Sequence, residues 1–562
     1  MLTRTYSAGL LGVDGYLITV EADVGLGLPC LTIVGQVSGA LHEARERVRS
    51  ALAHCGHPIP PRKQIVNLAP AEVRKDSPGL DLGIACALLL SHGVLPAGSL
   101  ADTLLWGELA LDGALRAASG TLIIADTARR AGFRRMIVAR ACAREAGLIP
   151  GLEILPAADL PALIAHLRSE KPLPPLPPAP LQSAPFDSPR HSAPRHSSPP
   201  HSSPPHSPAP APDTLRPDPP PDPCLSPCPD MLPDMADVRG STLARRAIEI
   251  MVAGGHNLLL HGPPGVGKTM LARRVAGLLP DLPTEEALAV TKIHGVAGRR
   301  TGGYIEELRE LIRRPPVRNP HHTVSVAGLL GGGGPPRPGE VSLAHRGILF
   351  LDELPEFPRA CIEGLREPLE EGSVTIVRAR YALRFPADFQ LMATMNPCPC
   401  GWLGHPQRVC TDSPAAVRRY QGRVSGPFMD RMDLVVPLTP LSRAEFALAK
   451  AGEGSAPIRL RIAQARARQA ERLASTPWSR NAEIPAAGEA IERWCVLTPE
   501  AERLLVAIAQ RRGASMRSFH RMRRVARTIA DLDPRPDLDP CAPVPKAAVA
   551  LAARLRLLPE AA

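Results

Sequence analysis

The sequence predicts an α/β protein in two parts, joined by a proline-rich tether. Before the tether, short apolar runs that alternate like strands are interleaved with runs of helical spacing. After it, NLLLHGPPGVGKTMLARRVAGLL (257–279) reads in order as a strand, a glycine-rich loop and an amphipathic helix. The 562 residues therefore divide into an N-terminal α/β domain (1–170), a tether (171–234), an α/β core (235–440) and a C-terminal helical lid (441–562).

Five runs of the first segment have the alternation of strands, and three have helical spacing. The strand-like runs are YLITVEADV, CLTIVG, QIVNLAP, LLWGELAL and RMIVA. The helical runs are SGALHEARERVRSALAHCG, GLDLGIACALLLSHG and TLIIADTARRAG. The last segment lacks strand signals and includes two long helical runs, PIRLRIAQARARQAERLA and SMRSFHRMRRVARTIADL.

The tether is recognised by its composition. Of the 62 residues from Pro172 to Pro233, 24 are proline and one, Phe186, is aromatic. Such a segment cannot bury enough apolar surface to offset its ordering entropy, so we expect a disordered linker. A phrase close to HSSPP recurs along it. Repeat expansion explains these histidines more simply than a metal site does.

The charge balance is basic, with 66 Lys and Arg against 55 Asp and Glu, a net charge of +11. The lid carries much of this excess, which either faces a polyanion or forms a solvated arginine-rich helical surface. The chain shows no signal peptide and no run approaching the ~18 apolar residues of a membrane span. Its 12 cysteines, without a secretory leader, are typical of reduced thiols. We expect a cytoplasmic protein without membrane contact.

A phosphate-binding loop lies between the strand and the helix predicted at 257–279. Its residues fit the pattern GxxxxGK[ST] in the context that this pattern needs. Glycines let backbone N–H groups turn inward around phosphate oxygens, Lys268 is expected to reach the β- and γ-phosphates, and Thr269 to hold Mg²⁺. The nucleotide-binding residues predicted here are Gly262, Pro263, Pro264, Gly265, Val266, Gly267, Lys268 and Thr269.

Two acidic residues end the apolar run GILFLDE (347–353). Asp352, at a strand's carboxyl end, is expected to position Mg²⁺, and Glu353 to polarise the attacking water. A further strand, FQLMATMNP, ends at Asn396, whose amide is placed to orient that water. The acidic pair indicates an ATP hydrolase rather than a passive nucleotide-binding protein, with ATP and Mg²⁺ as cofactors.

An arginine that serves a neighbouring subunit is predicted in SGPFMDRMD (425–433). Arg431, beside a helix end, is placed to reach the γ-phosphate of an adjacent subunit. Such arginine fingers accelerate hydrolysis by roughly 10³ to 10⁵. A finger supplied in this way requires a ring or a filament, and the alternative for Arg431 is an ordinary surface salt bridge.

These motifs together with a helical lid resemble an AAA+ ATPase. The phrases HHTVSVAGLLGGGGPPRPGEVSLAHRGILFLDELPEF and SGPFMDRMDL resemble the magnesium-chelatase-like branch and, within it, the ComM/YifB family. The resemblance implies that Arg517 on the lid, or Arg521 in its place, senses the γ-phosphate. It also implies a hexameric helicase that acts on single-stranded or branched DNA, alongside recombination proteins, and promotes branch migration during natural transformation. The alternative is a magnesium-chelatase motor subunit that drives metal insertion into a tetrapyrrole.

The segment from Glu371 to Pro386 reads as a hairpin with Arg378 and Arg380 near its tip. Its place before the Asn396 strand resembles the pre-sensor hairpin with which such rings grip nucleic acid. These arginines suit phosphate contact without base reading, so we expect salt-dependent, sequence-tolerant DNA binding. Pairing with carboxylates across the subunit interface is the alternative. The glycine-rich Gly328–Gly334 belongs either to a pore-directed insertion, as the resemblance implies, or to a surface loop.

Three cysteines and an aspartate share one short loop: Cys398, Cys400, Cys410 and Asp412. They supply the ligands of a tetrahedral zinc site, but the spacing C-x-C-x9-C-x-D departs from common zinc patterns. Relatives in the family often carry a fourth cysteine in the final position. Free thiols are therefore the alternative to Zn²⁺.

The N-terminal segment resembles the Lon protease domain. The resemblance rests on KDSPGLD (75–81) and GELALDG (107–113). The nucleophilic serine of that family falls at Gly79 and its lysine at Leu122. A Ser–Lys mechanism needs an oxygen nucleophile and an amine, so the resemblance implies a domain that is not a protease. We expect it to serve assembly or the docking of DNA or partners.

Overall fold

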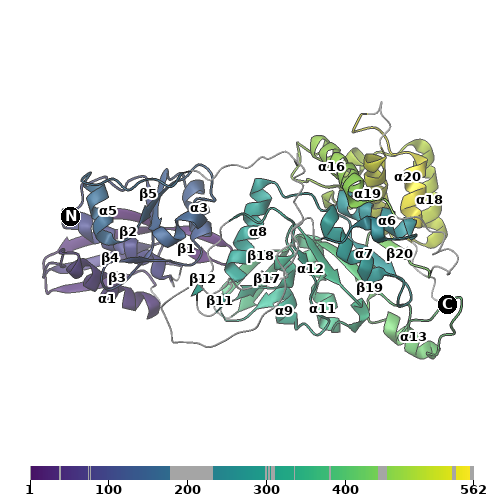
Figure 1. Ribbon diagram of the computed structural model, residues 1–562, viewed down its shortest axis with the longest axis horizontal. Helices are drawn as coiled ribbons and strands as arrows, with labels where there is room; N and C mark the ends of the chain where they lie inside the picture. The colour runs from purple at the N-terminus through teal and green to yellow at the C-terminus, as the bar shows by residue number, and fades with distance from the viewer. Residues whose placement is uncertain are drawn as a thin grey trace, which may run out of the picture.

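A computed structural model places the elements of both α/β units (Figure 1). It describes residues 2–36, 39–73, 75, 77–177, 232–297, 300–301, 304–305, 310–334, 336–378, 381–440, 452–533 and 539–556. Most of the expected tether lies outside these residues, and so does Arg380. Within the described part, no helix combines the length and the apolar character that crossing a membrane demands.

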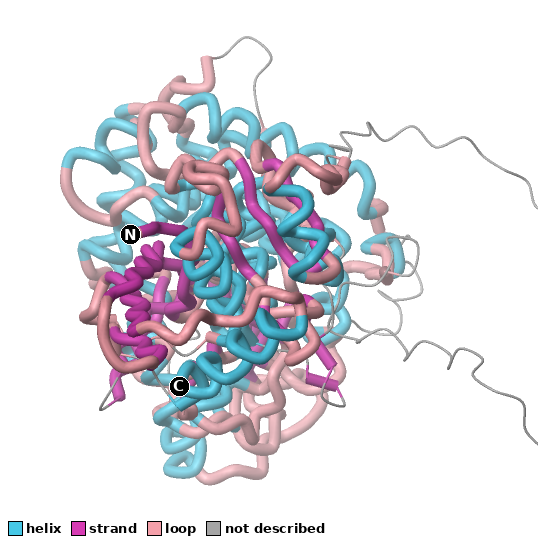
Figure 2. The backbone as a smooth tube through the Cα atoms, turned by 90° about the vertical axis from the view of Figure 1, so that its left-hand side faces the viewer, coloured by secondary structure: helices cyan, strands magenta, loops and turns pink. Residues whose placement is uncertain are grey.

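The first unit is a seven-stranded mixed sheet in the order β3-β4-β2-β1-β5-β8-β9. Its strands are β1 (Thr3–Leu11), β2 (Asp14–Gly25), β3 (Cys30–Val34), β4 (Lys63–Ala69), β5 (Thr103–Trp106), β8 (Arg135–Ala139) and β9 (Glu153–Ala157). Its helices are α1 (Gly39–His54), α2 (Asp81–Ser91), α3 (Thr121–Arg130), α4 (Ala143–Ala146) and α5 (Leu160–Leu167). Both α2 and α3 pack on β1 and β2, and α2 is buried along almost its whole length because it is apolar on all sides. Figure 2 views the molecule from this unit's side.

The second unit is a five-stranded, all-parallel sheet in the order β13-β16-β19-β10-β20. Its strands are β10 (Leu258–His261), β13 (Val317–Arg318), β16 (Ile348–Leu351), β19 (Gln390–Met395) and β20 (Leu434–Pro437). The main helices of this unit are α6 (Thr242–Gly254), α7 (Lys268–Arg274), α8 (Thr284–Ala297), α11 (Arg359–Gly364), α12 (Arg366–Glu371), α13 (Pro414–Gln421) and α14 (Gly426–Met429). Because the strands are parallel, all their carboxyl ends meet at one edge of the sheet and all their amino ends at the other.

Two-stranded hairpins project from this unit. The hairpin predicted between Glu371 and Pro386 is confirmed as β17 (Ser373–Arg378) paired antiparallel with β18 (Tyr381–Pro386). The glycine-rich stretch forms α9 (Val326–Leu330) and a second hairpin, β14 (Gly331–Gly332) with β15 (Arg337–Pro338). A Cβ atom at Gly331 would lie 2.7 Å from the Ile376 side chain, so the two hairpins pack against each other.

The C-terminal part is helical and packs on α6. Its helices are α16 (Ser455–Arg472), α17 (Glu489–Trp494), α18 (Pro499–Arg512), α19 (Met516–Leu532) and α20 (Lys546–Arg554). The two long helical runs predicted from the sequence are α16 and α19. In Figure 1 they lie side by side at the upper right, and they contact each other.

Within the described residues, six arginines of the lid are buried, and neither expectation for the lid's positive charge describes these six. Arg472 donates two hydrogen bonds, of 2.9 and 2.8 Å, to the carboxylate of Asp531, and both side chains are fully buried. Arg527 pairs with the same carboxylate at 2.9 Å. The other buried arginines of the lid are Arg480, Arg521, Arg523 and Arg524. These six cations have partners inside the protein, partly in the lid and partly in the α/β core, and are not part of a basic surface.

Candidate functional site

The phosphate loop spans residues 262–267, between the end of β10 and the first residue of α7. Gly265 and Gly267 have φ angles of 81° and 89°, a left-handed conformation that favours glycine. A side chain at Gly262 would collide with the carbonyl oxygen of Leu438, at the end of the neighbouring strand. The glycines are therefore required by the local backbone, and the loop leads into a helix amino terminus, where phosphate binds well.

Lys268 is buried at the first position of α7. Its Nζ donates to the carbonyl oxygens of Gly262 at 2.6 Å and Pro263 at 2.9 Å, and to Oδ1 of Asn396 at 2.7 Å. Burial lowers the pKa of Lys268 to about 8, although the carboxylates of Asp352 and Glu353 act in the opposite direction. The ammonium group thus lies inside the loop, held by partners that phosphate oxygens can replace.

Hard oxygen ligands for Mg²⁺ converge beside this lysine. The hydroxyl of Thr269 donates to Oδ2 of Asp352 at 3.0 Å. Asp352 directly follows β16, so its carboxylate lies at the carboxyl edge of the sheet. One hydroxyl and one carboxylate are a usual protein contribution to a magnesium ion that also binds substrate phosphates. The donor set therefore fits the Mg²⁺–nucleotide complex expected from the sequence.

Thr394 was not singled out from the sequence, yet it holds both acidic residues. Its hydroxyl donates to Oδ1 of Asp352 at 2.5 Å and accepts a hydrogen bond from the backbone N–H of Glu353 at 2.9 Å. Glu353 adopts a left-handed φ of 55°, unusual for a residue with a side chain. The sequence signal that could have identified Thr394 is the two-residue period of a strand. Thr394 is a polar residue in an apolar strand, and it lies two residues before Asn396, so both side chains are on the same face.

Arg431 lies at the opposite edge of the sheet from the phosphate loop. Asn257 immediately precedes β10, and its side-chain amide donates to the carbonyl oxygen of Arg431 at 3.1 Å. The backbone N–H of Asn257 donates to Asp433 at 3.0 Å. A strand rises about 3.3 Å per residue, so the four residues of β10 separate the two edges by about 13 Å. Arg431 is therefore remote from the phosphate loop of its own chain.

Arg517 accompanies Arg431 and not the phosphate loop. Nη2 of Arg431 lies 2.5 Å from Oε1 of Glu370, and Nη1 of Arg517 lies 3.4 Å from the same oxygen. Arg431 is buried, whereas Arg517 is half exposed. Arg521, the substitute considered for Arg517, is buried and pairs with Asp433 at 2.9 Å, so it holds the backbone at this edge.

Arg378 is exposed at the end of β17, beside Val377, whose side chain is 69% exposed. Its guanidinium lies 3.7 Å from the place where a Cβ atom of Gly332 would stand, so it reaches the glycine hairpin. The end of β17 thus presents an exposed cation that reaches the neighbouring glycine hairpin.

The predicted cysteine loop brings its four candidate ligands together. The sulfur atoms of Cys398, Cys400 and Cys410 lie 3.4 to 3.6 Å apart, and a carboxylate oxygen of Asp412 lies 3.8 Å from the sulfur of Cys410. The loop follows β19 directly after Asn396, so it adjoins the phosphate-binding edge.

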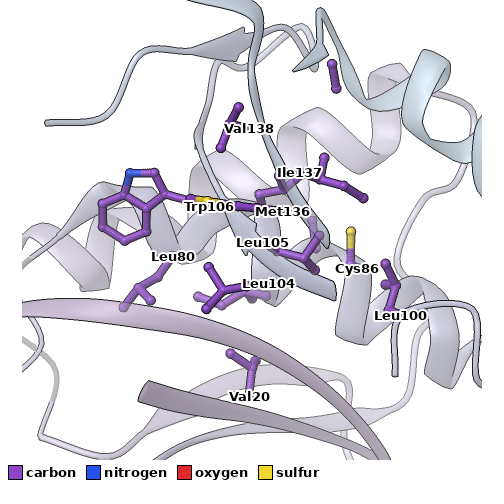
Figure 3. Packing of buried hydrophobic residues seen from close by; sticks show 14 of the residues in the cluster. Val20, Leu80, Cys86, Leu100, Leu104, Leu105, Trp106, Met136, Ile137 and Val138 are labelled. Atoms are coloured by element: carbon purple, nitrogen blue, oxygen red, sulfur yellow. The ribbon is translucent and has the colours of Figure 1, made fainter. Parts of the chain in front are cut away.

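Gly79 and Leu122 occupy the places where the Lon resemblance puts a nucleophile and a base. A Cβ atom at Gly79 would lie 2.6 Å from the indole of Trp106, so this place is already filled. Figure 3 shows that indole beside Leu80, next to other apolar side chains of the core. Leu122 is buried in the same apolar core.

Comparisons with known proteins cover both units. Three family models match: magnesium chelatase subunit ChlI over residues 234–446, subunit ChlI of Mg-chelatase over 20–142, and the ChlI C-terminal region over 452–552. The uncharacterized protein YifB of Escherichia coli is 39% identical across 95% of this chain and 94% of its own. The competence protein ComM of Haemophilus influenzae is 35% identical across 94% of each. The magnesium-chelatase 67 kDa subunit of Chlorobaculum parvum is 26% identical across 37% of this chain and 26% of its own.

Proposed function

Because the chain belongs to the ComM/YifB family of magnesium-chelatase-like AAA+ proteins, we propose that it is an ATPase that moves DNA through a ring of identical subunits. One observation carries the proposal. The residues proposed to bind the nucleotide lie at the carboxyl edge of the parallel sheet, whereas Arg431, whose guanidinium pairs with Glu370, lies at the amino edge. One chain supplies the nucleotide-binding half of a site and a second chain supplies the arginine, so a complete site lies between two chains.

At the carboxyl edge, this chain's residues bind and orient the nucleotide. Lys268 exchanges its present carbonyl partners for the β- and γ-phosphates, and Thr269 with Asp352 holds Mg²⁺. When bound, the metal neutralises charge on the phosphates. Glu353 then takes up the proton of the attacking water, and Asn396, already in contact with Lys268, orients that water.

At the amino edge, Arg431 and Arg517 act on the neighbour's nucleotide. They share Glu370, so they approach a neighbouring γ-phosphate as a pair. In this arrangement the lid arginine reads the nucleotide of the next subunit. A closed hexameric ring places six such junctions around one pore, and each hydrolysis event changes one junction.

The paired hairpins are the proposed DNA contact. Arg378 and its neighbour Arg380 bind backbone phosphates of single-stranded or branched DNA without reading bases, which makes binding sequence-tolerant and steeply salt-dependent. The similarity to a competence protein over 94% of the chain favours branch migration of recombination intermediates as the process driven. The similarity to a chelatase subunit covers only 37% of the chain, so metal insertion is the less favoured function.

The N-terminal unit serves assembly or docking and does not cut peptides. The indole of Trp106 stands where an oxygen nucleophile would have to be, and Leu122 carries no amine. A casein- or peptide-hydrolysis assay with ATP present is expected to show no cleavage by the full chain.

The test is steady-state ATP hydrolysis with and without single-stranded or branched DNA. We expect DNA to raise the rate of wild type, and the double variant Arg378→Ala/Arg380→Ala to hydrolyse at the unstimulated rate with or without DNA. Arg503→Ala, an exposed arginine on α18, is the matched control and keeps full stimulation. A wild-type rate that no DNA form changes contradicts the DNA motor and favours the chelatase-type function.

A further inference from the structure

The cysteine loop after Asn396 has the geometry of a closed metal site. We propose that Cys398, Cys400, Cys410 and Asp412 bind one structural Zn²⁺ ion, and that this ion fixes the loop against the phosphate loop. The second half of this inference rests on the proposed ATP site.

The distances among the donor atoms fit one tetrahedral ion. The three sulfur atoms are separated by 3.4, 3.5 and 3.6 Å, and all four donor atoms lie within 4.8 Å of one another. Ligands about 2.3 Å from zinc define a tetrahedron with edges of about 3.8 Å. A disulfide requires a sulfur–sulfur distance of about 2.05 Å and unites only two thiols. Three nearly equal separations therefore describe a shared ion better than an oxidised pair.

The chemistry of the donors selects the metal. Three thiolates favour zinc over magnesium or calcium, which prefer oxygen ligands. Four protein ligands close the coordination shell, and a closed shell is typical of structural rather than catalytic zinc. Backbone N–H groups support the ligands: that of Cys400 donates to Asp412 at 2.8 Å, and that of Leu403 donates to the sulfur of Cys398 at 3.4 Å. Such outer contacts orient metal ligands.

The same loop touches the ATP site at two places. Gly401 lies between two of the ligands with a φ of 82°, and a Cβ atom there would stand 2.5 Å from the ring of Pro264 in the phosphate loop. Two residues before Cys398 is Asn396, which accepts the hydrogen bond from Lys268. A zinc ion that ties Cys398 to Cys410 thus fixes both the asparagine and the surface on which Pro264 rests.

The experiment measures bound metal and nucleotide affinity on the full-length chain. Mass spectrometry of metals is expected to find about one zinc ion per wild-type chain. Asp412→Ala and Cys410→Ser are expected to lose it and to weaken binding of a fluorescent ATP analogue about fivefold or more, the effect of one lost hydrogen bond. Asp412→Cys replaces the carboxylate with a fourth thiolate and is expected to keep both the zinc and the ATP affinity. Cys541→Ser, which removes an exposed thiol elsewhere, is the control.

A measurement on the wild-type protein keeps the test valid even if the variants fail to fold. Adding Co²⁺ to metal-depleted wild type is expected to give the strong visible bands of a tetrahedral cobalt–thiolate centre. Absence of zinc and of these bands overturns the metal site. Zinc loss in Asp412→Ala with unchanged ATP affinity overturns the coupling to the phosphate loop. Zinc binding by a chain whose ATPase ignores DNA overturns only the proposed motor function.

Discussion

The two edges of the five-stranded sheet differ in what they lack. The carboxyl edge has the lysine, the acids and the asparagine that we propose bind a nucleotide and activate water, but Arg431 lies at the other edge of its own chain. The amino edge has two arginines on one carboxylate, Glu370, and no phosphate loop. Under the proposed function each edge is one half of a catalytic site, so the polarity of a parallel sheet would make activity a property of the junction between chains.

The largest expected effect comes from removing Arg431 from the amino edge. Arg431→Ala is expected to reduce kcat for ATP by roughly 10³ or more, because the charge that develops on the γ-phosphate loses its neighbouring cation. Nucleotide binding at the intact carboxyl edge persists. Measuring ATP turnover and the binding of a fluorescent ATP analogue on the same variant distinguishes lost catalysis from lost binding.

Mixing variants tests on which chain the arginine acts. Lys268→Ala lacks the nucleotide site, and Arg431→Ala lacks the finger, so neither is expected to turn over alone. Mixed rings contain junctions with one intact carboxyl edge and one intact amino edge, and activity returns at those junctions. If the mixture stays as inactive as its components, the arginine does not act between chains.

Glu353→Gln damages only the carboxyl edge. The amide cannot accept the proton of water, so the rate is expected to fall about 10² to 10⁴-fold while ATP binding remains. Retained ATP should hold the ring together, which size-exclusion chromatography with ATP detects. Asn396→Asp, which replaces the orienting amide, serves as a comparison with a smaller loss. A Glu353→Gln protein with near wild-type turnover places the base elsewhere.

Lys268, at the carboxyl edge, is expected to make the affinity for ATP depend on pH. The pKa of Lys268 is about 8 in the nucleotide-free chain because of burial, and phosphate contact needs the ammonium form. Below pH 8 the proton is already present. As the pH rises above 8, binding must take it up, so the Kd for ATP should rise up to about tenfold per pH unit. Lys268→Arg stays charged throughout and should give a flat profile.

The smallest expected effect is at the amino edge. Glu370→Gln frees Arg431 and Arg517 from a partly exposed carboxylate, a pair worth at most about 1 kcal/mol. The ATP concentration for half-maximal rate is expected to fall by up to about fivefold, because the carboxylate no longer competes with phosphate. A loss as large as that of Arg431→Ala would instead make Glu370 the residue that positions the finger.

The carboxyl edge was predictable from the sequence because its signals are local. A phosphate loop, an acidic pair and an asparagine each follow an apolar strand, and parallel strands bring such endings together. The fold class follows from the same patterns. The first unit was predicted less completely: β9, α4 and α5 were missed, and the run LLWGELAL divides into β5 and the short β6 (Glu108–Leu109).

The amino edge was not predictable in detail because its contacts join distant segments. Nothing in the sequence near Glu370 indicates that it holds arginines 61 and 147 positions away (431 − 370 and 517 − 370). The lid arginines were hard to place for the same reason. Arg472 meets Asp531 only because α16 packs on α19. The net charge of the lid, counted from its sequence, does not distinguish such a buried ion pair from charges on the surface.

The indole beside Gly79 leaves no room for a serine at this position. A serine introduced there meets a ring 2.6 Å from its Cβ atom, so it must come with a smaller residue at position 106. That second change alone leaves a cavity and costs about 3 to 5 kcal/mol. Each change is harmful without the other, so neither substitution alone can give this position a serine nucleophile.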